Sequence, residues 1–290
     1  MKVINLEQGS TQWLNWRKSK VTASKIGAIM GTSPYQTPND VYEEMIGDSL
    51  GQPPNFAMQR GLALEPIARQ IVSKTFELDL QPLVVEHDEI SYLAASLDGF
   101  DKRQEIVWEN KAPGKQEHSE TETKGIPSKY FFQCHMQLFI TGAKKLLYTT
   151  INDNHEIKHT WLLPDLAVSA KIQKAALDFY TNLQNRIPPA LTEKDYVVRN
   201  DDAWKAATTD YLDIHSLYEE VSENLKRARL ELIRQADNKR TRGHGISIYF
   251  KKQRNPINYE KLCSENNIDS EKYRTPGLKT IPTVTVDGTA

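Results

Sequence analysis

The sequence is poor in cysteine and has no long hydrophobic run, and each absence excludes a class of protein. Two cysteines, Cys134 and Cys263, are too few for a disulfide scaffold, and too few for a zinc or iron–sulfur centre. No run of about 18 apolar residues occurs, and the first ten residues lack the apolar core of a signal peptide. We therefore expect a soluble, cytoplasmic protein.

The sequence also lacks a dominant charge. The formal net charge is −1 at pH 7, so overall charge indicates no partner and only local clusters can. What is present suffices for a sizeable core, because 39% of the 290 residues are hydrophobic and 9% are aromatic. This length fits one large domain, or one domain with a smaller extension.

Hydrophobic periodicity predicts helices that alternate with β-hairpins. Residues 10–31 predict a helix, a break and a second short helix, and residues 39–47 a helix capped by Asn39 or Asp40. Pro66 lies near the start of a further helix or kinks it. A polar turn, DKRQ, predicts a hairpin. The expected helices are 58–78, 128–142 and 164–185, and the expected strands are 83–87, 90–100, 105–112, 144–152 and 157–164.

This order argues for an α/β core with a mixed sheet flanked by helices. Pro188-Pro189 cannot continue a helix, so we place a domain boundary there, with a core at 1–187 and an extension at 188–290. The extension is expected to be mainly helical over about 201–239, a helical hairpin followed by short strands. Residues 272–290 are expected to form a short edge strand or a loose end.

The stretch VWENKAPG, residues 107–114, places an acid and a base at the end of a buried strand. Glu109 and Lys111 point to one face and Asn110 to the other, because side chains alternate along a strand. A hairpin centred near residue 103 brings Asp98 within reach of Glu109. A divalent cation would relieve the repulsion of two such acids, and the lysine could orient water or stabilise a phosphate. The alternative is a solvated surface salt bridge.

Five motifs favour the first interpretation. SLDGF followed by EIVWENKAPG resembles the two-part signature of the PD-(D/E)xK nuclease superfamily. WRKSKVTASKIGAIMG, QRGLALEPIAR and PSKYFFQCHMQLFITG resemble further elements of the lambda exonuclease/YqaJ family, in the family's order. The resemblance implies a restriction-endonuclease-like core at 1–187 and a hydrolase that cleaves DNA.

The resemblance also implies roles for individual residues. Asp98, Glu109, Lys111 and Gln137 would be catalytic, with Lys111 activating the attacking water. A Mg²⁺ ion, which Mn²⁺ could replace, would be held by Glu65, Asp98, Glu109 and the backbone carbonyl of Asn110. Arg17 and Ser24 match positions that hold a DNA 5′-phosphate. Alternatively, Glu65 is a helix acid and Arg17 an exposed surface residue.

By the same resemblance, the chain would digest linear double-stranded DNA 5′→3′ for phage-type recombination. It would work with a single-strand annealing protein. It would form a homo-oligomer, because relatives form rings, and it would be encoded by a phage or prophage of a bacterial host. Two alternatives remain: an endonuclease of restriction or repair type with the same active site, and an inactive DNA-binding module.

The extension carries a local basic excess. Residues 224–254 contain ten Lys or Arg against Glu231 and Asp237. Leu225, Ala228, Leu232 and Ile233 give this stretch one apolar face. We expect the charges to contact the DNA backbone or another subunit, the alternative being a solvated helix that pairs with the acidic stretch before it.

Overall fold

The computed structural model describes residues 1–47, 55–250 and 256–269. The chain divides into two compact units, Met1–Val197 and Val198–Ala290. In the part of the chain that is described, no helix has the length and apolarity that a membrane span requires. The predicted boundary between 187 and 188 stays a prediction.

The first unit is built on a mixed seven-stranded sheet. Its path runs β1-β3-β4-β5-β6-β7, and β2 pairs with β4 off this path. The pairs β5–β6 and β2–β4 are parallel and the others antiparallel, which confirms the predicted mixed sheet. The strands are β1 Lys2–Ile4, β2 Val21–Thr22, β3 Gln81–Glu86, β4 Leu93–Asp101, β5 Ile106–Lys111, β6 Lys145–Ile151 and β7 Ile157–Leu162.

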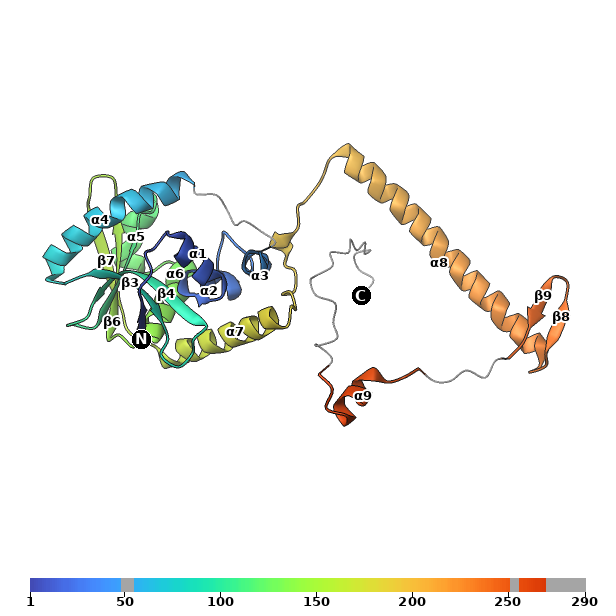
Figure 1. Cartoon of the computed structure of the whole chain (residues 1–290). Coiled ribbons are helices and arrows are strands. Elements are labelled where there is room, and N and C mark those ends of the chain that lie inside the picture. Colours follow the sequence, from blue (N-terminus) through green and yellow to red (C-terminus); the bar gives the residue numbers. More distant parts are fainter. Residues whose placement is uncertain (48–54, 251–255, 270–290) are drawn as a thin grey trace. The chain divides into compact units, whose positions relative to one another are not determined.

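Helices cover both faces of this sheet (Figure 1). One core cluster joins the sheet to α2, α3, α6 and α7, with buried residues such as Ile26 and Ile172. A second cluster packs α4 against Trp108 and Leu147. The helices of this unit are α1 Thr11–Lys18, α2 Ala23–Ile29, α3 Pro38–Ile46, α4 Phe56–Phe76, α5 Lys115–Lys124, α6 Ser128–Thr141 and α7 Leu166–Gln184.

The predicted cap of α3 was wrong. The cap of α3 is Thr37, whose side chain accepts the N–H of Asp40 at 3.1 Å, while the Asp40 carboxylate accepts the N–H of Thr37 at 2.8 Å. Pro38 is compatible with this capping box because it occupies the first turn, where its missing N–H costs nothing. Pro66 lies inside α4 rather than near its start, so the second expectation for it, a kink in the helix, stays a prediction.

The second unit contains one long helix, α8 Asp202–Ala236, where a helical hairpin was expected (Figure 1). No Gly or Pro occurs between these residues, so nothing breaks the helix, and Asp201 caps it by accepting the N–H of Trp204 at 3.0 Å. A small antiparallel pair, β8 Thr241–Gly243 and β9 Ile246–Ile248, and α9 Tyr259–Glu265 follow. The expectations for 272–290 lie outside the described residues.

Candidate active site

The β4–β5 hairpin brings Asp98 and Glu109 together, as predicted. Gly99 pairs with Trp108, and the ladder runs on to Asp101 and Ile106. The Asp98 carboxylate accepts the backbone N–H of Asn110 at 2.8 Å. Gly99 is required at this point, because an added Cβ would lie 2.9 Å from the Trp108 ring and 3.0 Å from Leu80.

Three side chains converge on the Glu109 carboxylate, which is only 1% exposed. Lys111 forms an ion pair with it from the same face of β5. Gln137 donates to Oε2 at 2.6 Å and Gln133 donates to Oε1 at 2.5 Å, both from α6. The structure therefore brings together three of the predicted site residues, Glu109, Lys111 and Gln137. Gln133 was not among the predicted site residues, although it lies one helical turn before Gln137.

Lys111 is held as an ammonium. Burial alone would lower its pKa, but the neighbouring negative charges of Glu109 and Asp98 raise it above its ordinary value. The ammonium also lies 5.0 Å from the centre of the Tyr130 ring, which adds a cation–π contact. In this state, Lys111 can orient a ligand or stabilise negative charge.

Glu65 reaches the same site from α4. It forms an ion pair with Arg69, one turn along the helix, and Arg69 also donates to the Asp98 carbonyl at 3.0 Å. Burial and the charge of Glu109 raise the pKa of Glu65 despite Arg69. Burial, Glu109 and Glu65 together raise the pKa of Asp98 well above its ordinary range. The three carboxylates thus repel one another, which is the situation that a cation relieves.

The side chains at this site are of the chemical type that binds a hard divalent cation. Glu65, Asp98 and Glu109 offer only oxygen atoms, the ligands that Mg²⁺ prefers. The Asn110 side chain accepts from Thr149 at 2.8 Å on the opposite face, which leaves its backbone carbonyl as the predicted ligand. Within residues 1–47, 55–250 and 256–269, however, no three His, Cys, Asp or Glu side chains are grouped closely enough to hold a metal as they stand.

Arg17 and Ser24, the predicted phosphate anchor, lie in contact. The Arg17 guanidinium donates to the Ser24 hydroxyl at 2.9 Å and stacks over the Trp13 ring at 4.3 Å. Trp13 in turn donates from its indole N–H to the Ser96 hydroxyl at 3.1 Å. Ser96 precedes Asp98 by two residues on β4, so one indole connects the anchor to the strand that carries the acid.

A second cation lies close to this anchor. Lys25 is buried and pairs with Glu44 at 3.0 Å. Glu44 also interacts with Arg17. Burial lowers the pKa of Arg17 below its ordinary value, and the negative charge of Glu44 offsets part of this effect. Sequence reasoning missed Trp13, Lys25 and Glu44. The spacing of four residues between Trp13 and Arg17 on a helix was the available signal for the first.

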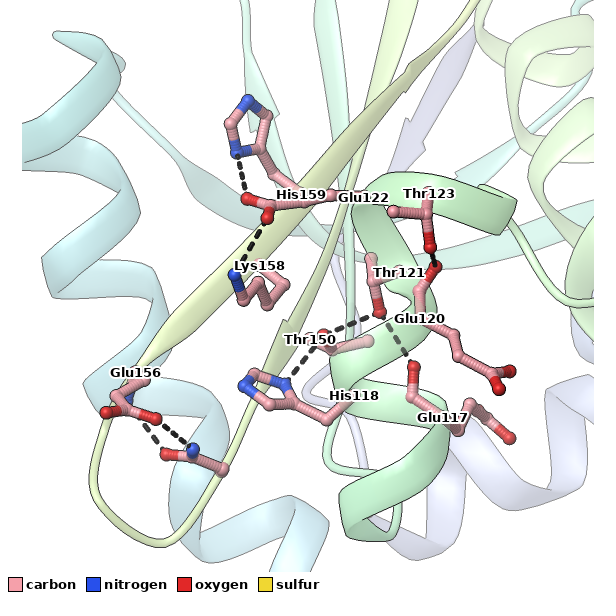
Figure 2. A network of polar contacts seen from close by, with 11 residues as sticks. Glu117, His118, Glu120, Thr121, Glu122, Thr123, Thr150, Glu156, Lys158 and His159 are labelled. Carbon is pink, nitrogen blue, oxygen red and sulfur yellow. Dashed lines mark hydrogen bonds and ion pairs between the residues drawn. The ribbon is translucent and has the colours of Figure 1, made fainter.

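A separate polar network lies where α5 packs on β6 and β7 (Figure 2). Thr150 contacts the His118 ring and the Thr121 hydroxyl, each at 2.9 Å. Further along, Lys158 pairs with Glu122 at 2.8 Å. Thr150 pairs with Lys111 across the β5–β6 ladder, so this network supports the strand beside the site.

Comparison with known proteins finds similarity within the first unit. Residues 12–144 match the YqaJ-like viral recombinase domain. No curated protein matches the sequence. Among solved structures, the chain is similar to an alkaline exonuclease from Laribacter hongkongensis, with 26% identity and a TM-score of 0.54 over 61% of this chain and 94% of the other. The structure of that exonuclease in complex with dAMP also matches over 61% of this chain and 94% of the other, with 26% identity and a TM-score of 0.52.

Proposed function

Because residues 12–144 belong to the YqaJ-like viral recombinase family, we propose that this chain is a magnesium-dependent exonuclease that digests linear double-stranded DNA in the 5′→3′ direction. A nuclease that acts on DNA is supported by the matched family together with the similar exonuclease. Magnesium, polarity and end dependence are the parts that need experiment.

The observation that carries the proposal is the grouping of Asp98, Glu109 and Lys111 at the end of one hairpin. In the ion pair of Glu109 and Lys111 the carboxylate is buried, at 1% exposed, and the lysine side chain is 25% exposed, unlike the solvated surface pair that was the alternative. Asp98 keeps a raised pKa beside it. A fold that only needed stability would gain little from such a cluster, since replacing buried charges by apolar residues is often neutral or stabilising.

The chemistry is hydrolysis of a phosphodiester. A bound Mg²⁺, held by Glu65, Asp98, Glu109 and the Asn110 carbonyl, would supply charge stabilisation on the phosphate. Lys111 would hold the scissile phosphate or the attacking water through its ammonium. Gln133 and Gln137 would fix the Glu109 carboxylate in one orientation, because each of its oxygens receives one amide N–H.

End dependence is assigned to the Arg17–Ser24 pair. A guanidinium and a hydroxyl already in contact can receive a terminal phosphate with little reordering. An enzyme that cuts internally has no use for such an anchor, which favours an exonuclease over an endonuclease. Binding of a 5′-phosphate there would set the 5′→3′ direction.

The proposed partners follow the family. Duplex DNA is the substrate, and a single-strand annealing protein would receive the 3′ tails that digestion leaves. The chain would form a homo-oligomer, which the resemblance suggests is a ring. It would be encoded by a phage or prophage and would act in the cytoplasm of a bacterial host.

The test is a time course on linear duplex DNA with a 5′-phosphate or a 5′-hydroxyl, beside a closed circle, in magnesium and in chelator. The proposal expects magnesium-dependent loss of the phosphorylated linear DNA, slower loss of the hydroxyl form, and an intact circle. Cleavage of the circle would instead indicate an endonuclease. Binding of DNA without cleavage of either form would indicate an inactive DNA-binding module.

A further inference from the structure

The long helix α8 exposes a continuous apolar seam. Apolar side chains recur at alternating intervals of three and four residues, and Ile214, Tyr218 and Leu225 on this seam are 60%, 68% and 68% exposed. This interval is the heptad repeat of a coiled coil, sustained here over more than four repeats. The seam is defined as Trp204, Ala207, Tyr211, Ile214, Tyr218, Val221, Leu225, Ala228, Leu232 and, at its polar end, Gln235.

We propose that this seam binds the same seam of a second copy of the chain, with the two α8 helices antiparallel. A seam of this length on a helix of 35 residues needs a partner helix, because its side chains otherwise stay in water. The proposal concerns assembly and does not depend on the nuclease function.

The sizes of the seam residues favour the antiparallel orientation. When the two-fold axis lies between Glu219 and Glu220, Tyr211 meets the partner's Ala228, and Leu232 meets the partner's Ala207. In both of these layers a large side chain then faces a small one. A parallel pair in register would place tyrosine against tyrosine and alanine against alanine, which leaves crowding at one layer and a gap at the next.

The charges beside the seam favour the same orientation. Residues 226–234 carry four basic side chains and one acidic, and residues 205–213 carry two acidic and one basic. The antiparallel pair places these two segments side by side, whereas the parallel pair places each basic segment against its own copy. Glu219 and Glu220 lie near their own copies in both orientations, so they do not decide between them.

The first test measures the mass of the full-length protein in solution by light scattering. A matched pair of leucines supplies the variants: Leu225 lies on the seam and Leu230 lies off it, and both are exposed on α8. Leu225→Asp should halve the number of chains per particle, and Leu230→Asp should leave it as in the wild type. A monomeric wild type, or equal masses for wild type and Leu225→Asp, would overturn the proposal.

The second test fixes the orientation by cross-linking in a Cys263→Ser background, since Cys263 is the partly exposed cysteine of the two. Ile214→Cys and Leu225→Cys chains are prepared separately, mixed, and treated with a short bis-maleimide. The antiparallel pair predicts a covalent dimer that requires both chains, because Ile214 faces the partner's Leu225. A covalent dimer from Ile214→Cys chains alone would indicate a parallel pair and overturn the proposed orientation.

Discussion

Gln137 donates a hydrogen bond of 2.6 Å to Glu109, and both side chains are almost completely buried. The amide comes from α6 and the carboxylate from β5, so this bond fixes a helix against the strand that carries the site. Gln133, also on α6, donates a hydrogen bond of 2.5 Å to the other oxygen of the Glu109 carboxylate. Glu109 can therefore keep its orientation without help from solvent.

Replacing Gln137 by alanine should weaken both activity and stability. The substitution leaves a buried carboxylate oxygen without its donor, which costs about 1–3 kcal/mol of unfolding free energy. Loss of orientation should lower the cleavage rate by about 10-fold or more. Urea unfolding and a nuclease assay test this, with the exposed Gln116→Ala as the matched control. Equal rates for the two variants would show that Gln137 has no part in the site.

Arg17→Ala should remove the preference for phosphorylated ends. A guanidinium makes charged hydrogen bonds to phosphate, and losing them should lower kcat/KM by about 10- to 100-fold. The loss is expected on DNA with a 5′-phosphate and not on DNA with a 5′-hydroxyl. Lys18→Ala, an exposed cation next along the same helix, is the control and should change neither rate by much. An equal loss on both substrates would argue for general DNA contact instead.

Magnesium should stabilise the protein through Asp98. A ligand at ten times its Kd adds about 1.4 kcal/mol to the unfolding free energy. Burial and the charges of Glu109 and Glu65 raise the pKa of Asp98, so its ionised form destabilises the fold at neutral pH. Asp98→Asn should therefore be at least as stable as the wild type in chelator, and should gain little from magnesium. Thermal unfolding with and without magnesium measures both effects, and an unchanged gain in Asp98→Asn would contradict the assigned ligand.

Asp101 should contribute to stability only above acidic pH. Burial alone would raise its pKa, but the backbone N–H groups of Gln104 and Asp79, at 2.7 and 2.8 Å, lower it below the ordinary value of 3.8. Because its pKa is lowered by folding, Asp101 stabilises the folded protein above pH 3.8, and this stabilisation is lost as the pH falls below 3.8. Asp101→Asn should cost about 1–2 kcal/mol at pH 7. Unfolding curves from pH 6 to pH 2 should fall less steeply for this variant, and parallel curves would contradict the assignment.

The hairpin that carries the site could be predicted because its signals are local. Alternation along β5 placed Glu109 and Lys111 on one face and Asn110 on the other, and the polar turn set the register that brings Asp98 across. The spacing of four residues in α6 places Gln133 on the same helical face as the predicted Gln137, although Gln133 itself was not predicted. Such patterns depend on residues within a few positions of one another.

Contacts between distant segments could not be predicted in this way. Trp13 meets Ser96 only because α1 packs beside β4, and Arg69 reaches the Asp98 carbonyl across a tertiary interface. Neither contact has a periodic signature in the sequence. The expected helical hairpin in the extension was wrong for a different reason: basic and acidic stretches suggested two paired helices, but no residue between them breaks the chain.

The most direct test of the central claim compares wild type and Lys111→Ala on a 5′-phosphorylated linear duplex in magnesium. Removing the ammonium that pairs with Glu109 should slow digestion by about 10²- to 10⁴-fold, while DNA binding in chelator stays near that of the wild type. Circular dichroism verifies that the variant is folded. Digestion by a folded Lys111→Ala at the wild-type rate would contradict the claim that this hairpin is the active site.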